Sequence, residues 1–316
     1  MAAHVAAAPV AVPGRGENAE RSLKVKMAGL PRGVAYRALR TTIRFVAAGD
    51  SRLAWRSLGE GHPILLCTRF RGTMASWDPA FLDALARQGC RVILFDPAGV
   101  GYSGGRRRYN PIEMVDDLRD LLDGLGLDRV ALLGWSLGGL VAQAALLTLS
   151  PRVSHLALIG TAPPGPVSAA AQPLFFDLAA APEDDERARM AIDFDLSSEK
   201  GRTAAQRSTQ RVARWDSTGM VPVPAAWAAA QLGDQPRNPI FPAPGVHEAM
   251  LHCQQPVLCL CGAGDIGFPA ENWRAMVAAN PGIEAICIAD AGNAPHHQYP
   301  RWSARMVGRL LLRQPG

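Results

Sequence analysis

A Gly-x-Ser-x-Gly motif between a strand and a helix constrains this chain more than any other feature. Residues 130–133 form an apolar run typical of a buried strand, and an apolar helical segment begins at Leu137. Residues 134–138 between them read Gly-Trp-Ser-Leu-Gly. The glycines indicate a turn too tight for a Cβ, which forces Ser136 into a strained conformation with its hydroxyl exposed. The Leu137 amide, at the helix start, would face an oxyanion formed there.

The same alternation of apolar strands and helices runs through most of the chain. The patterns predict strands at 42–47, 53–58, 64–67, 91–95, 130–134, 155–159, 256–261 and 283–288, and helices at 79–88, 111–125, 137–149 and 300–312. Because fully apolar strands must be covered on both faces, this order predicts an α/β fold with a largely parallel sheet.

Two stretches depart from this alternation. Residues 163–252 carry many Ala, Pro and charged residues in short helical pieces, and an insertion of about 90 residues is far longer than an ordinary loop. We expect it to form a helical cap between two parts of the core, 41–162 and 253–316. Residues 1–40 are predicted to be an N-terminal extension, by default a flexible arm. An ordered arm would favour a homodimer.

Composition excludes several classes of protein. Hydrophobic residues make up 48% and charged residues 19% of the chain, which allows a large core and excludes global disorder. The net charge of +5 is small and dispersed, so nucleic acid is not an expected partner. No long apolar run predicts a membrane span, and the N-terminus lacks a secretory pattern, so we expect a cytoplasmic protein. The six cysteines have no spacing suited to zinc, and no metal site is predicted.

Three further motifs accompany the Ser136 turn. Residues 63–77 look like a strand followed by an oxyanion loop, residues 96–103 match D-x-x-G-x-G-x-S, and residues 262–265 look like a strand end that carries an acid. With these motifs, the chain from about residue 41 onward resembles the α/β-hydrolase superfamily. It is similar to the small esterases, enol-lactonases and metal-free haloperoxidase-like members. The resemblance implies a mostly parallel eight-stranded sheet flanked by helices, with a helical cap.

The resemblance also assigns roles to individual residues. Ser136 would be the nucleophile, Asp265 the acid that orients a histidine, and the Phe70 and Leu137 amides the oxyanion hole. A small-molecule carboxylic ester or lactone would react through an acyl-enzyme on Ser136, without metal or organic cofactor. One departure lies before Phe70, where Thr68-Arg69 replaces the usual His-Gly. Arg69 would either contact the substrate or turn outward into solvent.

A second departure affects the catalytic base. The flanks of residues 290–300 match the family, yet Asn293 stands at the usual histidine position. Asparagine has no basic lone pair that accepts a proton near neutral pH. Three explanations remain open: an exchange of His for Asn that traps a bound substrate or acyl-enzyme, a rearranged loop in which His296 or His297 serves as the base, or a protein that works without the base.

The third explanation defines the alternative functions. Such a protein would be a non-hydrolytic biosynthetic enzyme of this fold, for example a cyclase or acyl transferase, or a receptor for a small ligand. Several aromatic residues would either line a substrate pocket under the cap or pack in the interior: Trp135, Phe175, Phe176, Trp215 and Trp227.

Overall fold

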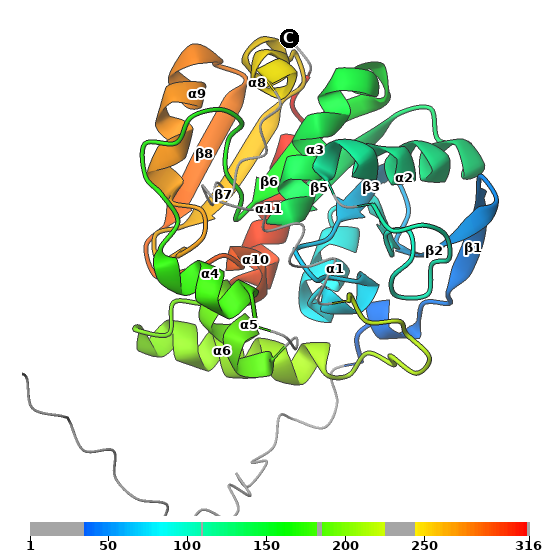
Figure 1. Cartoon of the computed structure of the whole chain (residues 1–316), viewed down its shortest axis with the longest axis horizontal. Coiled ribbons are helices and arrows are strands. Elements are labelled where there is room, and N and C mark those ends of the chain that lie inside the picture. Colours follow the sequence, from blue (N-terminus) through cyan, green and yellow to red (C-terminus); the bar gives the residue numbers. More distant parts are fainter. Residues whose placement is uncertain (1–34, 109, 182–184, 225–243, 315–316) are drawn as a thin grey trace, which may run out of the picture. The chain divides into compact units, whose positions relative to one another are not determined.

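The computed structural model describes residues 35–108, 110–181, 185–224 and 244–314. Residues Tyr36–Gly316 form one compact unit. Its centre is one eight-stranded sheet (Figure 1). The strands are β1 (Arg44–Ala48), β2 (Ser51–Leu58), β3 (His62–Cys67), β4 (Cys90–Phe95), β5 (Val130–Trp135), β6 (Val153–Ile159), β7 (Val257–Gly262) and β8 (Ile283–Ile288).

The sheet is mostly parallel, as predicted. Its strand order is β1-β2-β4-β3-β5-β6-β7-β8. Only β2 runs antiparallel to its neighbours, β1 and β4, and the pairs from β4 to β8 are parallel. The chain adds β4 on one side of β3 and then β5 on the other. In open α/β sheets, ligands bind beyond the carboxyl ends of the strands at such a reversal, so the loops after β3 and β5 are the expected site.

Helices cover both faces of the sheet. On one face lie α2 (Pro111–Gly124), α3 (Leu137–Thr148), α8 (Pro244–His252) and α9 (Arg274–Ala279), and on the other lie α1 (Pro79–Ala86) and α11 (Pro300–Leu310) (Figure 1). Successive strand residues enter opposite cores: Leu65 packs in the first and Leu66 in the second. This alternation explains why the strands are apolar throughout.

Further helices gather at one end of the sheet, where α4 (Pro173–Ala179), α5 (Glu186–Asp193) and α6 (Glu199–Val212) lie together (Figure 1). The link between α5 and α6 packs on the loops after β7 and β8. A Cβ on Gly264 would lie 2.8 Å from the Asp195 Cβ, and one on Gly292 would lie 2.7 Å from the Phe194 carbonyl carbon. The division into extension, core and cap stays a prediction.

Every strand and helix predicted with bounds is present, and no bound differs from the predicted one by more than two residues. The prediction missed α9 and α10 (Pro295–Gln298), which are too short to show a helical period. Residues 35–40 are the last six residues of the predicted extension. The Arg37 and Ala38 amides donate to the Asp83 carboxylate of α1 at 2.9 Å, so this end of the extension is bound to the core. Among the helices that the structure describes, none combines the length and apolarity needed to cross a bilayer.

Candidate active site

Ser136 occupies a sharp turn between β5 and α3. Its backbone has φ 54° and ψ −119°, a left-handed conformation that L-residues rarely adopt. Such a conformation costs about 1–3 kcal/mol and persists only where its surroundings impose it. Here the Ser136 amide donates to the Ile159 carbonyl oxygen at 2.9 Å, and the Gly139 amide donates to the Ser136 carbonyl oxygen at 2.9 Å.

The glycines of the motif are required by close backbone contacts. A Cβ on Gly134 would lie 2.3 Å from the Gly138 carbonyl oxygen. A Cβ on Gly138 would lie 2.1 Å from the Cys67 carbonyl oxygen, at the end of β3. The start of α3 is therefore pressed against the chain that leads into the Phe70 loop.

This contact brings the two predicted oxyanion donors into neighbouring segments. Leu137 is the first residue of α3, where amides lack an intrahelical acceptor. Phe70 follows β3 by three residues and packs against the helix face of the core and against Phe175, Phe176 and Phe268. Among the residues that the structure describes, no acceptor takes the amide hydrogen of Phe70 or Leu137. Such amides can stabilise negative charge on a carbonyl oxygen.

Asp265 and Asn293 are directly hydrogen-bonded, so the two loops that the sequence predicted to carry the acid and the base do meet. Asn293 Nδ2 donates to Asp265 Oδ2 at 2.9 Å. The other carboxylate oxygen of Asp265 accepts from the Gly267 and Phe268 amides at 2.8 and 3.0 Å. Burial raises the pKa of the Asp265 carboxyl to about 6, while these three hydrogen bonds oppose the rise.

The hydrogen bonds of the Asn293 side chain all go to protein groups. Its Nδ2 also donates to the Gly160 carbonyl oxygen at 2.7 Å, and its Oδ1 accepts from Trp135 Nε1 at 2.9 Å. Asn293 is 1% exposed. Within the described part of the chain, the Ser136 hydroxyl has no hydrogen-bond partner. Asn293 thus occupies the base position without contacting the hydroxyl.

His296 lies in a closed aromatic environment. It is fully buried, and its ring centroid is 4.6–5.4 Å from those of Trp135, Phe81 and Trp77. Among the residues that the structure describes, neither ring nitrogen has a hydrogen-bond partner. Burial, with a smaller effect of His297, lowers the pKa of this imidazole well below its usual value. The hypothesis that His296 replaces the missing base gains no support from this placement.

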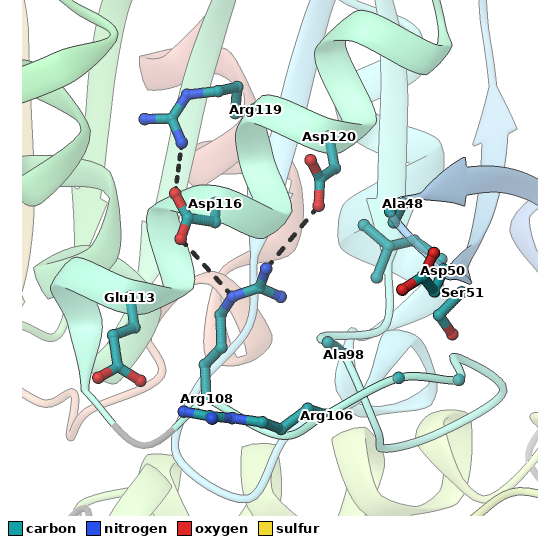
Figure 2. Close-up of a pocket in the computed structure, with 14 residues that line it drawn as sticks. Ala48, Asp50, Ser51, Ala98, Arg106, Arg108, Glu113, Asp116, Arg119 and Asp120 are labelled. Carbon is teal, nitrogen blue, oxygen red and sulfur yellow. Dashed lines mark hydrogen bonds and ion pairs between the residues drawn. The ribbon is translucent and has the colours of Figure 1, made fainter.

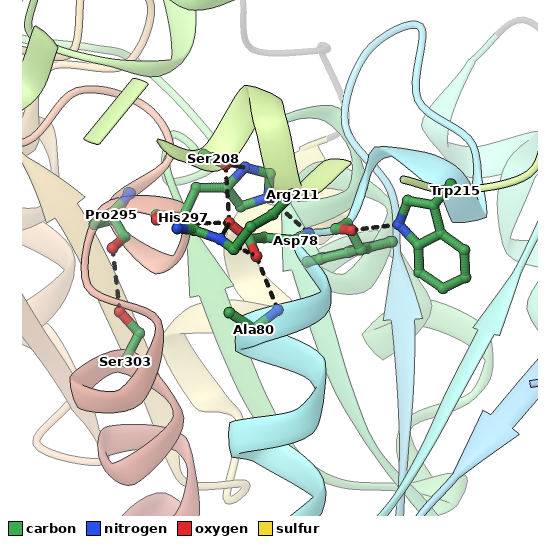
Figure 3. A network of polar contacts seen from close by, with 9 residues as sticks. Asp78, Ala80, Ser208, Arg211, Trp215, Pro295, His297 and Ser303 are labelled. Atoms are coloured by element: carbon green, nitrogen blue, oxygen red, sulfur yellow. Dashed lines mark hydrogen bonds and ion pairs between the residues drawn. The ribbon is translucent and has the colours of Figure 1, made fainter. Parts of the chain in front are cut away.

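His297 belongs to a polar network between α6, α1 and α10 (Figure 3). Its Nε2 accepts from the Asp78 amide at 3.3 Å, so Nδ1 carries the proton and donates to the Ser208 hydroxyl at 3.1 Å. Ser208 in turn donates to Asp78 Oδ2 at 2.9 Å. Arg211 Nη2 donates to the same oxygen at 2.6 Å and Nε donates to both carboxylate oxygens at 2.9 Å. The network fixes the neutral tautomer of His297 and joins α6 to the core.

The predicted substrate-lining aromatic residues have different environments. Trp135 is fully buried, and its indole N–H donates to Asn293 Oδ1. It therefore holds the Asn293 side chain in place and does not line a cavity in the described part of the chain. Phe175 and Phe176 pack with Phe268 near Asp265. Trp215 donates to the Trp77 carbonyl oxygen at 2.9 Å and lines a cavity. Trp227 lies outside the described residues.

Arg69 lies at the border between this cavity and the Ser136 turn. Its guanidinium carbon is 5.5 Å from the centroid of the Trp135 ring, and its Nη1 donates to the Phe70 carbonyl oxygen at 2.7 Å. The cavity has a volume of about 700 Å³ and is bounded by the Arg69–Ser76 loop, α5, α6 and the segment that follows α6. The sequence left the direction of Arg69 open, and the side chain does line the cavity.

A second hollow lies away from these residues, between the β1–β2 turn and α2 (Figure 2). Its volume is about 760 Å³. Several of its charged side chains form ion pairs: Arg108 with Asp116 and Asp120, and Arg119 with Asp116. Of the predicted site residues that the structure describes, none lines it. In the described ranges, no group of three or more His, Cys, Asp or Glu side chains is arranged to hold a metal ion.

Comparison with known proteins agrees with this architecture. The model of the alpha/beta hydrolase fold family matches residues 62–299, and the chain therefore belongs to that family. It is 27% identical over 250 residues to a pimeloyl-[acyl-carrier protein] methyl ester esterase of Aliivibrio salmonicida, an alignment that covers 77% of this chain and 89% of the esterase.

Solved structures share the fold at lower identity. An alpha/beta hydrolase fold protein from Chitinophaga pinensis superposes with a TM-score of 0.73 at 22% identity, covering 87% of this chain and 98% of that protein. The enol-lactonase from Burkholderia xenovorans LB400 superposes with a TM-score of 0.64 at 19% identity, covering 85% of this chain and all of the lactonase. These superpositions show the alpha/beta hydrolase fold.

Proposed function

We propose that the chain carries a serine hydrolase site for a carboxylic ester or lactone. Ser136 adds to the substrate carbonyl, the Phe70 and Leu137 amides bind the oxyanion, the alcohol leaves, and water releases the acid from the acyl-enzyme. The observation that carries the proposal is the strained Ser136 turn at the start of α3, beside the Phe70 loop. The esterase among the relatives supports the same substrate class.

Among the described residues of this site, no basic group accepts the proton of the Ser136 hydroxyl. The Asn293 amide nitrogen is not basic, and its oxygen already accepts the Trp135 indole hydrogen. Loss of one member of a catalytic triad typically reduces turnover by about 10⁴-fold or more. The chain as it stands is therefore an impaired hydrolase, in which an acyl-enzyme or a bound substrate would persist.

The substitution Asn293→His tests this proposal. An imidazole Nδ1 placed where Asn293 Nδ2 now lies would keep the 2.9 Å hydrogen bond to Asp265. We expect the turnover of 4-nitrophenyl esters to rise by roughly 10³-fold or more. The double variant N293H/S136A is the control and should return to the background rate. A folded N293H protein without ester turnover would contradict the proposal.

A second candidate is a protein that binds a small ligand or transforms it without hydrolysis, such as a cyclase or acyl transferase. The complete hydrogen bonding of Asn293 favours it, because every donor and acceptor of that amide fits a protein group. This candidate predicts that N293H gains no ester turnover while a ligand still binds and protects Ser136 from labelling.

A further inference from the structure

Asp96 is a fully buried carboxylate to which the proposed reaction assigns no role. It follows β4 directly and begins the D-x-x-G-x-G-x-S turn. Strands β3 and β4 are parallel neighbours in the sheet, so their carboxyl ends lie side by side. The loop after β3 carries Phe70, whose amide is the proposed oxyanion donor. Asp96 is therefore placed to act on that loop.

The two oxygens of the Asp96 carboxylate hold two different segments. Oδ1 accepts from the Met74 amide, in the loop after β3, at 2.7 Å. Oδ2 accepts from the Tyr102 amide, in the turn that Asp96 itself begins, at 2.8 Å. A Cβ on Gly101 would lie 2.2 Å from the carboxyl carbon, so this turn wraps closely around the carboxylate. The turn fixes the carboxylate, and the carboxylate fixes Met74.

The ionised form of Asp96 suits both hydrogen bonds. Burial raises the pKa of the Asp96 carboxyl to about 6, while the two amide hydrogen bonds and the positive charge of Arg56 on β2 oppose the rise. At about pH 8 the group is therefore a carboxylate, which accepts from both amides at once. An asparagine offers a single acceptor oxygen and would face the second amide with its own N–H donors.

The chain between β3 and Met74 forms one tight turn. The Gly72 amide donates to the Arg69 carbonyl oxygen at 2.9 Å, which closes the turn around Phe70 and Arg71. Arg71 has φ 55°, a left-handed conformation that persists only where its surroundings impose it. The turn is held by β3 at its start and by the carboxylate at its end, so the bond to Met74 bears on the position of Phe70.

We propose that Asp96 is a positioning residue of the oxyanion hole, which holds the Met74 amide and thereby sets the position of the Phe70 amide. The inference rests on the proposed function for its reaction, but the order of the loop can be measured without turnover. Position matters because an oxyanion donor has to lie about 2.7–3.1 Å from the oxygen that it stabilises. A displacement of about 1 Å in a catalytic site can reduce the rate by about 100-fold.

Asp83 on α1 provides a matched control. It is also buried, and each of its carboxylate oxygens also accepts one backbone amide, from Arg37 and Ala38 at 2.9 Å. Neither donor belongs to the loops after β3 and β5 that form the proposed site. Asp83→Ala therefore removes an equivalent set of hydrogen bonds elsewhere and reports the effect of a general loss of stability.

The first test measures hydrogen exchange in the chain with Asn293 unchanged, by peptide mass spectrometry. The amides of Gly72 and Thr73 report the order of the loop, because they donate within it, to the Arg69 carbonyl oxygen and the Ser76 hydroxyl. We expect Asp96→Ala to speed their exchange roughly tenfold or more, the effect of losing a hydrogen bond to a charged group. D83A should leave both amides unchanged. Melting curves show whether each variant folds.

The second test measures turnover of 4-nitrophenyl butyrate at about pH 8 in the N293H background. We expect N293H/D96A to lose roughly 10- to 100-fold in kcat with KM nearly unchanged, because an oxyanion donor acts mainly in the transition state. The value of kcat is calculated per Ser136 that a fluorophosphonate labels at completion, which removes the effect of unfolded protein. N293H/D83A should retain kcat. N293H/D96N, which keeps the side-chain volume and one acceptor, should lie between N293H and N293H/D96A.

The outcomes separate the two proposals. If D96A speeds exchange in the loop, D83A does not, and N293H hydrolyses no ester, the hydrolase is wrong and Asp96 still holds the loop. If N293H hydrolyses the ester and N293H/D96A loses no more kcat than N293H/D83A, the hydrolase stands and the role of Asp96 is overturned. Unchanged exchange of Gly72 and Thr73 in D96A also overturns it. Should D96A fail to fold, D96N decides in the same two assays.

Discussion

The pairing of Arg211 with Asp78 predicts a large and specific loss of stability. Asp78 is fully buried and Arg211 contacts both of its carboxylate oxygens (Figure 3). Arg211→Met removes the cation, and the buried carboxylate of Asp78 then keeps, within the described ranges, the hydrogen bonds from the Ser208 hydroxyl and the Ala80 amide. Breaking a buried ion pair in this way typically costs about 3–5 kcal/mol.

Urea denaturation, followed by tryptophan fluorescence and circular dichroism, measures this cost. We expect R211M to lose about 3–5 kcal/mol of unfolding free energy and roughly 6–20 °C in melting temperature. Arg207→Met, which changes an exposed arginine of the same helix, should stay within about 0.5 kcal/mol. In a D78N background, R211M should cost clearly less, because no buried charge is left unpaired. Equal effects of R211M and R207M would contradict a stabilising ion pair between Arg211 and Asp78.

Three further predictions follow from the site. His296→Phe should make the protein more resistant to acid. Burial lowers the pKa of the His296 imidazole, so below pH 6.5 the unfolded state binds a proton more readily than the folded state and the fold loses stability. The gain in unfolding free energy from the substitution should be about 2 kcal/mol larger at pH 5 than at pH 8. Gly138→Ala should lose about 3 kcal/mol or fail to fold, since its Cβ meets the Cys67 carbonyl oxygen, and soluble yield with melting temperature checks this. Ser136→Gly should raise the melting temperature by relieving a strain of about 1–3 kcal/mol, and an unchanged or lower value would contradict the strained turn.

The sheet and its flanking helices could be predicted because their signals are local. Strands such as Val130–Trp135 are short apolar runs, and α1 begins where Asp78 precedes Pro79, a capping pattern that the sequence displays. The Ser136 turn was predicted for the same reason, since its glycines lie within two residues of the serine. The meeting of Asp265 with Asn293 came from the family resemblance and not from any local pattern.

Other parts of the site depend on contacts between distant segments. Arg211 and Asp78 are 133 residues apart, and nothing near either residue indicates the other. The closed environment of His296 arises only when α1, α10 and Trp135 pack together. The residues next to His296 in the sequence do not indicate this burial, so the sequence alone keeps His296 as a candidate for the catalytic base. The sequence also does not predict the hydrogen bond from Trp135 to Asn293. A signal was present, because a buried tryptophan beside the serine needs an acceptor for its indole N–H.

Covalent labelling tests the central claim most directly, namely that the Ser136 oxygen is the reactive group beside the Phe70 and Leu137 amides. A fluorophosphonate is incubated with the unchanged chain, N293H and N293H/S136A, and peptide mass spectrometry locates the adduct. We expect rapid modification of Ser136 in N293H, slow modification of the same residue in the unchanged chain, and none in the double variant. A folded N293H protein that stays unmodified, or an adduct that persists after Ser136 is replaced, would contradict it.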